Sequence, residues 1–127
     1  MDIRALQGTQ WYRVELGAGA DLFQSLRDFL NRESLQEAYV LYGIGSVDKA
    51  VLAYPKTREI PPEIARVTLE DLFEINVIAG EVRRMAGQIK VHLHGSLTKQ
   101  AREVVGGAIL EGTRIFKVAE LVMIGVK

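Results

Sequence analysis

The sequence lacks cysteine altogether, and this absence removes several kinds of chemistry. Without a thiol there is no disulfide, no cysteine nucleophile and no cysteine-ligated zinc, and a reducing compartment is compatible with the composition. No stretch approaches the roughly 18 consecutive apolar residues that a membrane-spanning helix needs. The first residues also lack the apolar core of a signal peptide. We therefore expect a soluble, cytoplasmic protein.

An excess of charge of either sign is also missing. Sixteen basic and sixteen acidic side chains give the 127 residues a formal net charge of zero. Domains that bind nucleic acid through its phosphates usually carry a basic excess, so this molecule has no long-range attraction to a polyanion. Hydrophobic residues make up 48% of the chain and charged residues 25%. These proportions are typical of a single globular domain.

Prolines are scarce, and all three lie in a loop over residues 54–64 that separates two apolar halves. Before this loop, alternation predicts a strand over residues 11–16. Asp21 and Gln24 then have the spacing of a capping box that opens a helix. Apolar residues at helical spacing follow, so the helix should lie on a sheet. They are Leu22, Phe23, Leu26, Phe29 and Leu30.

The remaining apolar segments are typical of strands. Residues 38–45 and 46–54 are predicted as two strands that reverse tightly beside Gly43 and Gly45, and further strands are predicted over 72–83, 89–97, 104–110 and 115–126. Short connections favour antiparallel pairing. The prediction is an α+β fold with about seven mainly antiparallel strands, one main flanking helix and otherwise short helical segments.

The last predicted strand is apolar on both faces. Ala119, Leu121 and Met123 point one way, and Val122 and Ile124 point the other. One face packs on the core, and the other needs a second cover. Another subunit or the N-terminal segment could supply that cover, and we give the two equal weight.

The only two histidines stand two residues apart on a predicted strand. Over residues 88–98 apolar and polar side chains alternate, and His92 and His94 fall on the polar face. Residues i and i+2 of a strand are about 6.6 Å apart, so two imidazoles can converge on one metal ion. Alternatively, both side chains simply occupy a half-exposed polar face. Spacing alone favours this simpler interpretation.

A zinc site would need a third protein ligand, and no further histidine exists. A carboxylate of Glu74, Glu81 or Glu111, or a neighbouring subunit, would have to supply it. Gly106 and Gly107 predict the close approach of a backbone or a ligand, or a bulge. No glycine fingerprint for phosphate and no nucleophile elbow is present, so we predict no catalytic residue.

Two pairs of basic residues are the candidates for contacts to phosphate. Arg83 and Arg84 lie at a predicted hairpin tip, and Lys99 and Arg102 lie in the next loop. Basic residues at such positions more often only keep a turn soluble.

Taken together, the motifs resemble the plant-and-prokaryote-conserved (PPC) domain family. They occur in the family's order over roughly residues 12–126, and the resemblance implies one PPC-type domain over residues 1–127. The matching segments are Gly19-Ala-Asp-Leu22, Gly43-Ile-Gly-Ser-Val47, Leu72-Phe-Glu-Ile75 with Gly80, Val91-His-Leu-His94, Val105-Gly-Gly107, Leu110-Glu-Gly112 and Ala119-Glu-Leu-Val122.

The resemblance implies a homotrimer with a largely antiparallel sheet. It also implies a fold shared with acetolactate decarboxylase, a zinc enzyme that uses His-x-His and another histidine. Prokaryotic members of the family are often labelled DNA-binding proteins, but this chain has no Arg-Gly-Arg hook of the plant members. Many prokaryotic members carry a third histidine directly after the Gly-Gly pair, where this chain has Ala108.

Three functions follow as hypotheses. The first is a non-enzymatic trimeric module that binds a partner or small ligand in a polar cleft beside His92, His94, Gly106 and Gly107. The second is a zinc-binding protein or metal-dependent enzyme that uses the two histidines with a non-histidine third ligand. The third is a DNA-associated protein whose assembly presents the two basic pairs on one surface.

Overall fold

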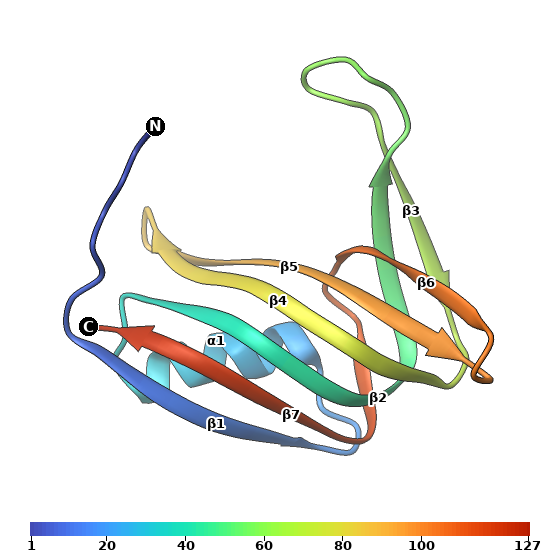
Figure 1. Cartoon of the computed structure of the whole chain (residues 1–127), viewed down its shortest axis with the longest axis horizontal. Coiled ribbons are helices and arrows are strands. Elements are labelled where there is room, and N and C mark those ends of the chain that lie inside the picture. Colours follow the sequence, from blue (N-terminus) through green and yellow to red (C-terminus); the bar gives the residue numbers. More distant parts are fainter.

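A computed structural model describes residues 1–127 as one seven-stranded sheet with a single helix (Figure 1). The strands follow the order β1-β7-β2-β4-β5-β6, with β3 paired to β2, and every pairing is antiparallel. The predicted α+β class is confirmed, whereas the short helical segments do not occur. The elements are β1 (Thr9–Gly17), α1 (Leu22–Arg32), β2 (Glu37–Pro55), β3 (Ile64–Leu69), β4 (Phe73–Met85), β5 (Gln88–Lys99), β6 (Glu103–Ile109) and β7 (Arg114–Val126).

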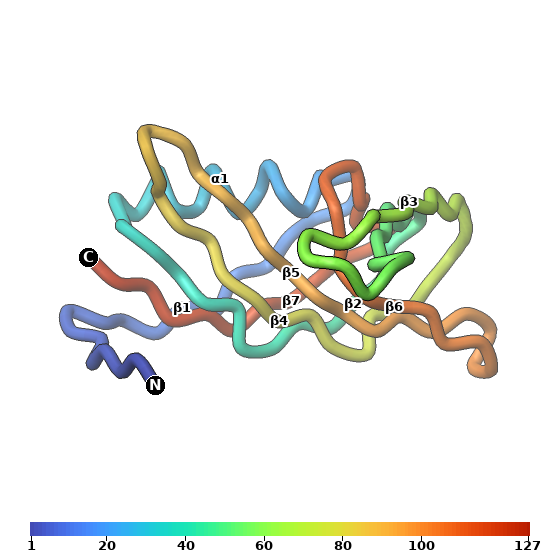
Figure 2. Tube along the Cα trace, turned by 90° about the horizontal axis from the view of Figure 1, so that it is seen from above, coloured from blue at the N-terminus to red at the C-terminus, as the bar shows by residue number.

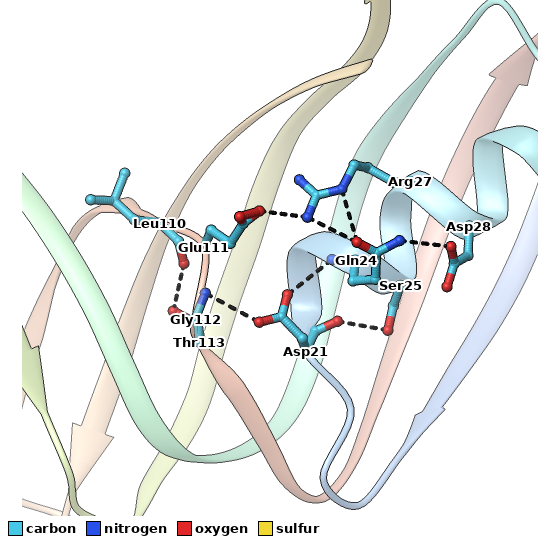
Figure 3. Close-up of polar contacts among 9 residues, drawn as sticks. All are labelled: Asp21, Gln24, Ser25, Arg27, Asp28, Leu110, Glu111, Gly112 and Thr113. Carbon is cyan, nitrogen blue, oxygen red and sulfur yellow. Dashed lines mark hydrogen bonds and ion pairs between the residues drawn. The ribbon is translucent and has the colours of Figure 1, made fainter. Parts of the chain in front are cut away.

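Helix α1 begins where the sequence predicts. Asp21 Oδ1 accepts the backbone N–H of Gln24 at 2.9 Å, as an N-cap does (Figure 3). The Gln24 side chain donates to Asp28 Oδ1 instead of reaching back to Asp21. Of the predicted capping box, only the bond from the Gln24 backbone N–H to Asp21 therefore forms. Asp21 Oδ2 also accepts the backbone N–H of Gly112, which ties the helix start to the loop before β7. With 11 residues, α1 is too short to cross a membrane.

The helix covers one face of the sheet, which we call the inner face. Figure 2 shows α1 on this side and the N-terminal segment toward the opposite side. All five predicted apolar residues of α1 are buried against inner-face side chains. Burial of such apolar surface is the main source of stability in a domain of this kind. The fully buried sheet residues include Ile78, Val82, Leu93, Leu97, Leu121 and Met123.

Strand β2 corrects one prediction. The expected reversal beside Gly43 and Gly45 does not exist, because residues 37–55 form one continuous strand. The pairing with β7 instead shifts register twice near Gly45, which has a φ of +140°. A Cβ at Gly45 would lie too close to the carbonyl oxygen of Val118. The glycine therefore permits a bulge with close approach of β7 rather than a turn.

The second half of β2 leaves the main sheet and pairs with two other strands. It forms a hairpin with β3, a strand that the sequence analysis missed, and this hairpin projects from the body (Figure 1). On its other side, Leu52 and Ala53 pair with Ile109 and Ala108 of β6. Strands β2, β4, β5 and β6 thus form a closed circuit, in which β5 is held between β4 and β6.

Candidate functional site

The two histidines lie side by side on the outer face of β5. Leu93 between them is fully buried, whereas both imidazoles are exposed. Their ring centroids are 5.2 Å apart, and the ring planes meet at 72°. The alternation of β5 thus places both rings on the side away from α1, where solvent or a partner can reach them.

A shallow recess of about 470 Å³ surrounds the rings; we call it the histidine recess. Its polar wall comes from neighbouring strands, since Tyr39 of β2 pairs with Glu81 of β4, and Glu81 pairs with His92. Gly80 lets β4 approach β5 closely at this point, because a Cβ there would overlap the backbone of β5. The lining residues are Tyr39, Ala79, Gly80, Glu81, His92 and His94. Sequence reasoning missed Tyr39 and Ala79, because only strand register brings them beside the histidines.

The glycine pair of β6 lies next to the histidine recess and outside its lining. Gly107 pairs with Gly95 and Gly106 with Ser96, while Ala108 pairs directly with His94. Gly106 allows close approach of the two strands, because a Cβ there would meet the Gly95 carbonyl oxygen. Ala108 therefore occupies the cross-strand position from which a side chain would reach the histidines.

The donor set of one chain does not fit a metal centre. No group of three His, Cys, Asp or Glu residues lies close enough to hold a metal ion. Glu81 pairs with His92 across the strands, whereas Glu74 pairs with Thr98 farther along β5. Glu111 forms an ion pair with Arg27 beside the start of α1 (Figure 3). A metal held here would need a ligand from outside the chain.

The four candidate basic residues form two separate pairs. Arg83 and Arg84 lie near the β4–β5 turn, and Lys99 and Arg102 lie at the other end of β5 (Figure 1). Arg83 pairs with Lys90, and Lys90 lies nine positions before Lys99 on β5. The two basic pairs are therefore roughly 30 Å apart along the strand. A single chain therefore does not present the four side chains on one surface.

Three of these basic side chains also have partners within the chain. Arg84 donates to the carbonyl oxygens of Leu30 and Leu35, at the end of α1. Lys99 Nζ lies 2.6 Å from Asp71 Oδ2, and the hydrogen bond and charge of Asp71 raise the pKa of Lys99. Arg83 binds the carboxylate of Glu37. Only Arg102 has no such contact.

Glu37 is a buried carboxylate at the edge of the outer face. Arg4 Nη2 donates to it at 2.8 Å and Arg83 Nε at 3.3 Å. Burial alone would raise the pKa of Glu37, but the hydrogen bonds from the two arginines outweigh burial and lower it. Through Arg4, this carboxylate anchors the N-terminal segment at one end of the sheet.

The outer face also carries exposed apolar side chains beside the histidine recess. Trp11 is 66% exposed, and Leu41, Tyr42 and Ile44 are 41–45% exposed; we call these four residues the outer apolar patch. The N-terminal segment, although anchored at Glu37, does not cover them. Cross-strand partners run from the patch to the recess in one row, which is Trp11, Ile124, Tyr39, Glu81 and His92.

With this fold and site in view, comparison with known proteins defines the class of protein. The model of the Plants and Prokaryotes Conserved (PCC) domain family matches residues 4–127. This chain therefore belongs to that family, and the resemblance inferred from its motifs is confirmed.

Solved structures support the same fold. A PPC protein from Pyrococcus horikoshii is 25% identical, with a TM-score of 0.86 over 100% of this chain and 85% of that one. A protein from Archaeoglobus fulgidus described as metal-containing is also 25% identical, with a TM-score of 0.84 over 99% and 85% of the two chains. A "Putative DNA-binding protein" from Ralstonia eutropha JMP134 is 20% identical, with a TM-score of 0.77 over 91% and 77%, and shows the fold alone.

One curated protein also matches in sequence. The bifunctional protein GlmU of Synechococcus sp. is 28% identical over 112 residues, which are 88% of this chain. The chain spans only 16% of the length of that relative. The match therefore concerns one segment of a much longer protein.

Proposed function

We propose that this chain is a non-enzymatic, homotrimeric PPC-domain module that binds a ligand or protein partner at the histidine recess. The observation that carries the proposal is the outer apolar patch, which no element of the same chain covers. Contiguous apolar surface of this kind usually marks an interaction site. The family resemblance implies that the cover is another copy of the chain.

Assembly and ligand binding are connected in this proposal by strand register. The row from Trp11 to His92 crosses five neighbouring strands, so a copy seated on the patch would reach the rim of the histidine recess. A closed ring of three copies would bury the patch of each one. The shallow recess would then become a cleft with a second wall, which suits binding better than an open surface does.

The molecular mass in solution tests the assembly. Sedimentation equilibrium should give about 42 kDa, three times the 14.1 kDa of the chain. Tyr42→Glu places a charge in the patch and should shift the mass toward 14.1 kDa. Ile60→Glu is the matched control, because Ile60 is 98% exposed in the β2–β3 loop and should leave the mass unchanged. A wild-type protein that sediments as a monomer would refute the proposal.

Zinc binding is the second candidate, and the geometry of the two imidazoles favours it. Their centroids lie 5.2 Å apart on an exposed face, and a 25%-identical protein is described as metal-containing. Because one chain offers no third ligand, a second copy would have to complete the site. Metal analysis of the purified protein decides the matter. Stoichiometric zinc that disappears in a His92→Ala, His94→Ala variant supports this candidate, and metal-free protein eliminates it.

DNA association has no comparable observation in its favour. The net charge is zero, and the basic pairs lie at opposite ends of β5 with three of the four side chains already in contact with partners. A surface that binds phosphates needs free cationic groups in proximity.

A further inference from the structure

A second recess lies on the outer face, at the opposite end of β5 from the Arg83–Lys90 pair. The β3–β4 turn, the β5–β6 turn and β7 enclose a space of about 530 Å³, a size typical of small-molecule sites. Thr98 at its edge is six residues beyond His92 on the same face of β5, so the two recesses are roughly 20 Å apart. We call this space the distal recess.

The walls of the distal recess include exposed apolar side chains. Leu72 is 52% exposed and Phe116 is 45% exposed, and both line the space. When an apolar group covers exposed leucine and phenylalanine side chains, apolar surface is removed from water and the free energy falls. The recess therefore suits a ligand with an apolar portion.

The recess also carries one free charge of each sign. Glu74 and Lys117 line it and form no ion pair, whereas the neighbouring Asp71 is already paired with Lys99 at 2.6 Å. Ser46 lies between the two free charges, because it pairs with Glu74 across the strands and its Oγ accepts the backbone N–H of Lys117 at 3.3 Å. Their backbones are therefore about two strand spacings apart, or roughly 10 Å. A small molecule can reach both side chains.

Two hydroxyl groups line the same space. Thr98 Oγ1 accepts the Asn76 amide N–H at 2.6 Å, and Ser46 Oγ accepts the Lys117 backbone N–H. Each hydroxyl retains its own hydrogen for donation. Donors with fixed partners lose little freedom when they bind an anion. The Ser46 hydroxyl and the Lys117 ammonium thus provide the groups that bind a carboxylate, and Glu74 provides an acceptor for an ammonium. Thr98 pairs with Glu74 and lies on the other side of it from Lys117.

We propose that the distal recess binds a small zwitterion with an apolar side chain, such as a free apolar α-amino acid. Its carboxylate binds Lys117 and the Ser46 hydroxyl, its ammonium binds Glu74, and its side chain packs against Phe116 and Leu72. This assignment goes beyond the proposed function, because it concerns a different site formed by a single chain. No bond is made or broken in it.

Calorimetric titration of the full chain tests the proposal. L-phenylalanine should bind, and phenethylamine and 3-phenylpropionate, each of which lacks one charge, should bind at least about tenfold more weakly. Lys117→Ala and Glu74→Gln should each weaken L-phenylalanine binding to a similar degree. Arg102→Ala is the matched control, since Arg102 lies in the adjacent β5–β6 turn but does not line the recess.

Two results would overturn the zwitterion proposal. One is the absence of binding at millimolar L-phenylalanine. The other is an affinity for the two analogues equal to that for L-phenylalanine. An L-phenylalanine affinity of the Lys117→Ala and Glu74→Gln variants equal to that of the wild type has the same meaning, when melting temperatures show that both variants fold. Neither result affects the sedimentation test, because the mass of the assembly is measured without ligand. Failure of this site is therefore distinguishable from failure of the proposed assembly.

Discussion

Replacement of Arg84 by alanine should destabilise the protein without affecting a nucleic-acid site. The guanidinium donates to Leu35 O at 2.8 Å, to Leu30 O at 3.2 Å and to Asn31 Oδ1 at 2.9 Å. Leu30 and Asn31 lie in the last turn of α1, and Leu35 follows shortly after the helix ends at Arg32. A positive charge at this end also interacts favourably with the helix dipole. Arg84 thus joins β4 to the end of the only helix.

The expected loss is moderate because the guanidinium is only partly buried. Hydrogen bonds contribute about 1 kcal/mol each, and water replaces part of what Arg84→Ala removes, so we expect a loss of about 2 kcal/mol. In a domain of this size that corresponds to a fall in Tm of about 7 °C. Thermal unfolding followed by circular dichroism measures it. Arg84→Lys should recover only part of the loss, since an ammonium lacks the planar fork.

Arg102→Ala serves as the control for Arg84→Ala. The Arg102 side chain is exposed and forms no hydrogen bond or ion pair, so its loss should change stability by less than about 0.5 kcal/mol. An unchanged Tm for Arg84→Ala would refute the capping argument. If that variant also lost retention of DNA at low salt while Arg102→Ala kept it, Arg84 would instead be a phosphate contact.

Three further predictions concern single positions. The lowered pKa of Glu37 stabilises the fold at pH values above the carboxyl's unfolded pKa of about 4.3, and this stabilisation is lost as the pH falls through the folded pKa. Glu37→Gln should therefore flatten the acid side of a plot of unfolding free energy against pH. Gly45→Ala should cost about 3 kcal/mol or more in urea denaturation, whereas Gly17→Ala, with open space around it, should cost less than about 1 kcal/mol. Ala108→His should add a third imidazole and raise zinc affinity at least about tenfold in calorimetry; an unchanged affinity would contradict the cross-strand geometry.

Local signals in the sequence predicted the elements that depend on near neighbours. Helix α1 was predicted because a cap at Asp21 and an apolar stripe at helical spacing lie within a dozen residues. The same holds for β5, where strict alternation placed both histidines on one face. The predicted number of strands agrees with the structure only because two errors cancel. The sequence analysis divided β2 in two and missed β3, whose alternation is weak because it lies at an exposed edge.

The amino-acid sequence alone determined the helix, most strands, the family and the adjacency of the two imidazoles, because each rests on residue spacing within one segment. Only the tertiary structure decided that Gly45 sits in a bulge, that Arg84 caps α1, and that Tyr39 and Glu81 border the histidines. These contacts join segments that lie tens of residues apart in the chain. Which residues meet across a sheet depends on strand order and register, and a one-residue shift would move every side chain to the other face.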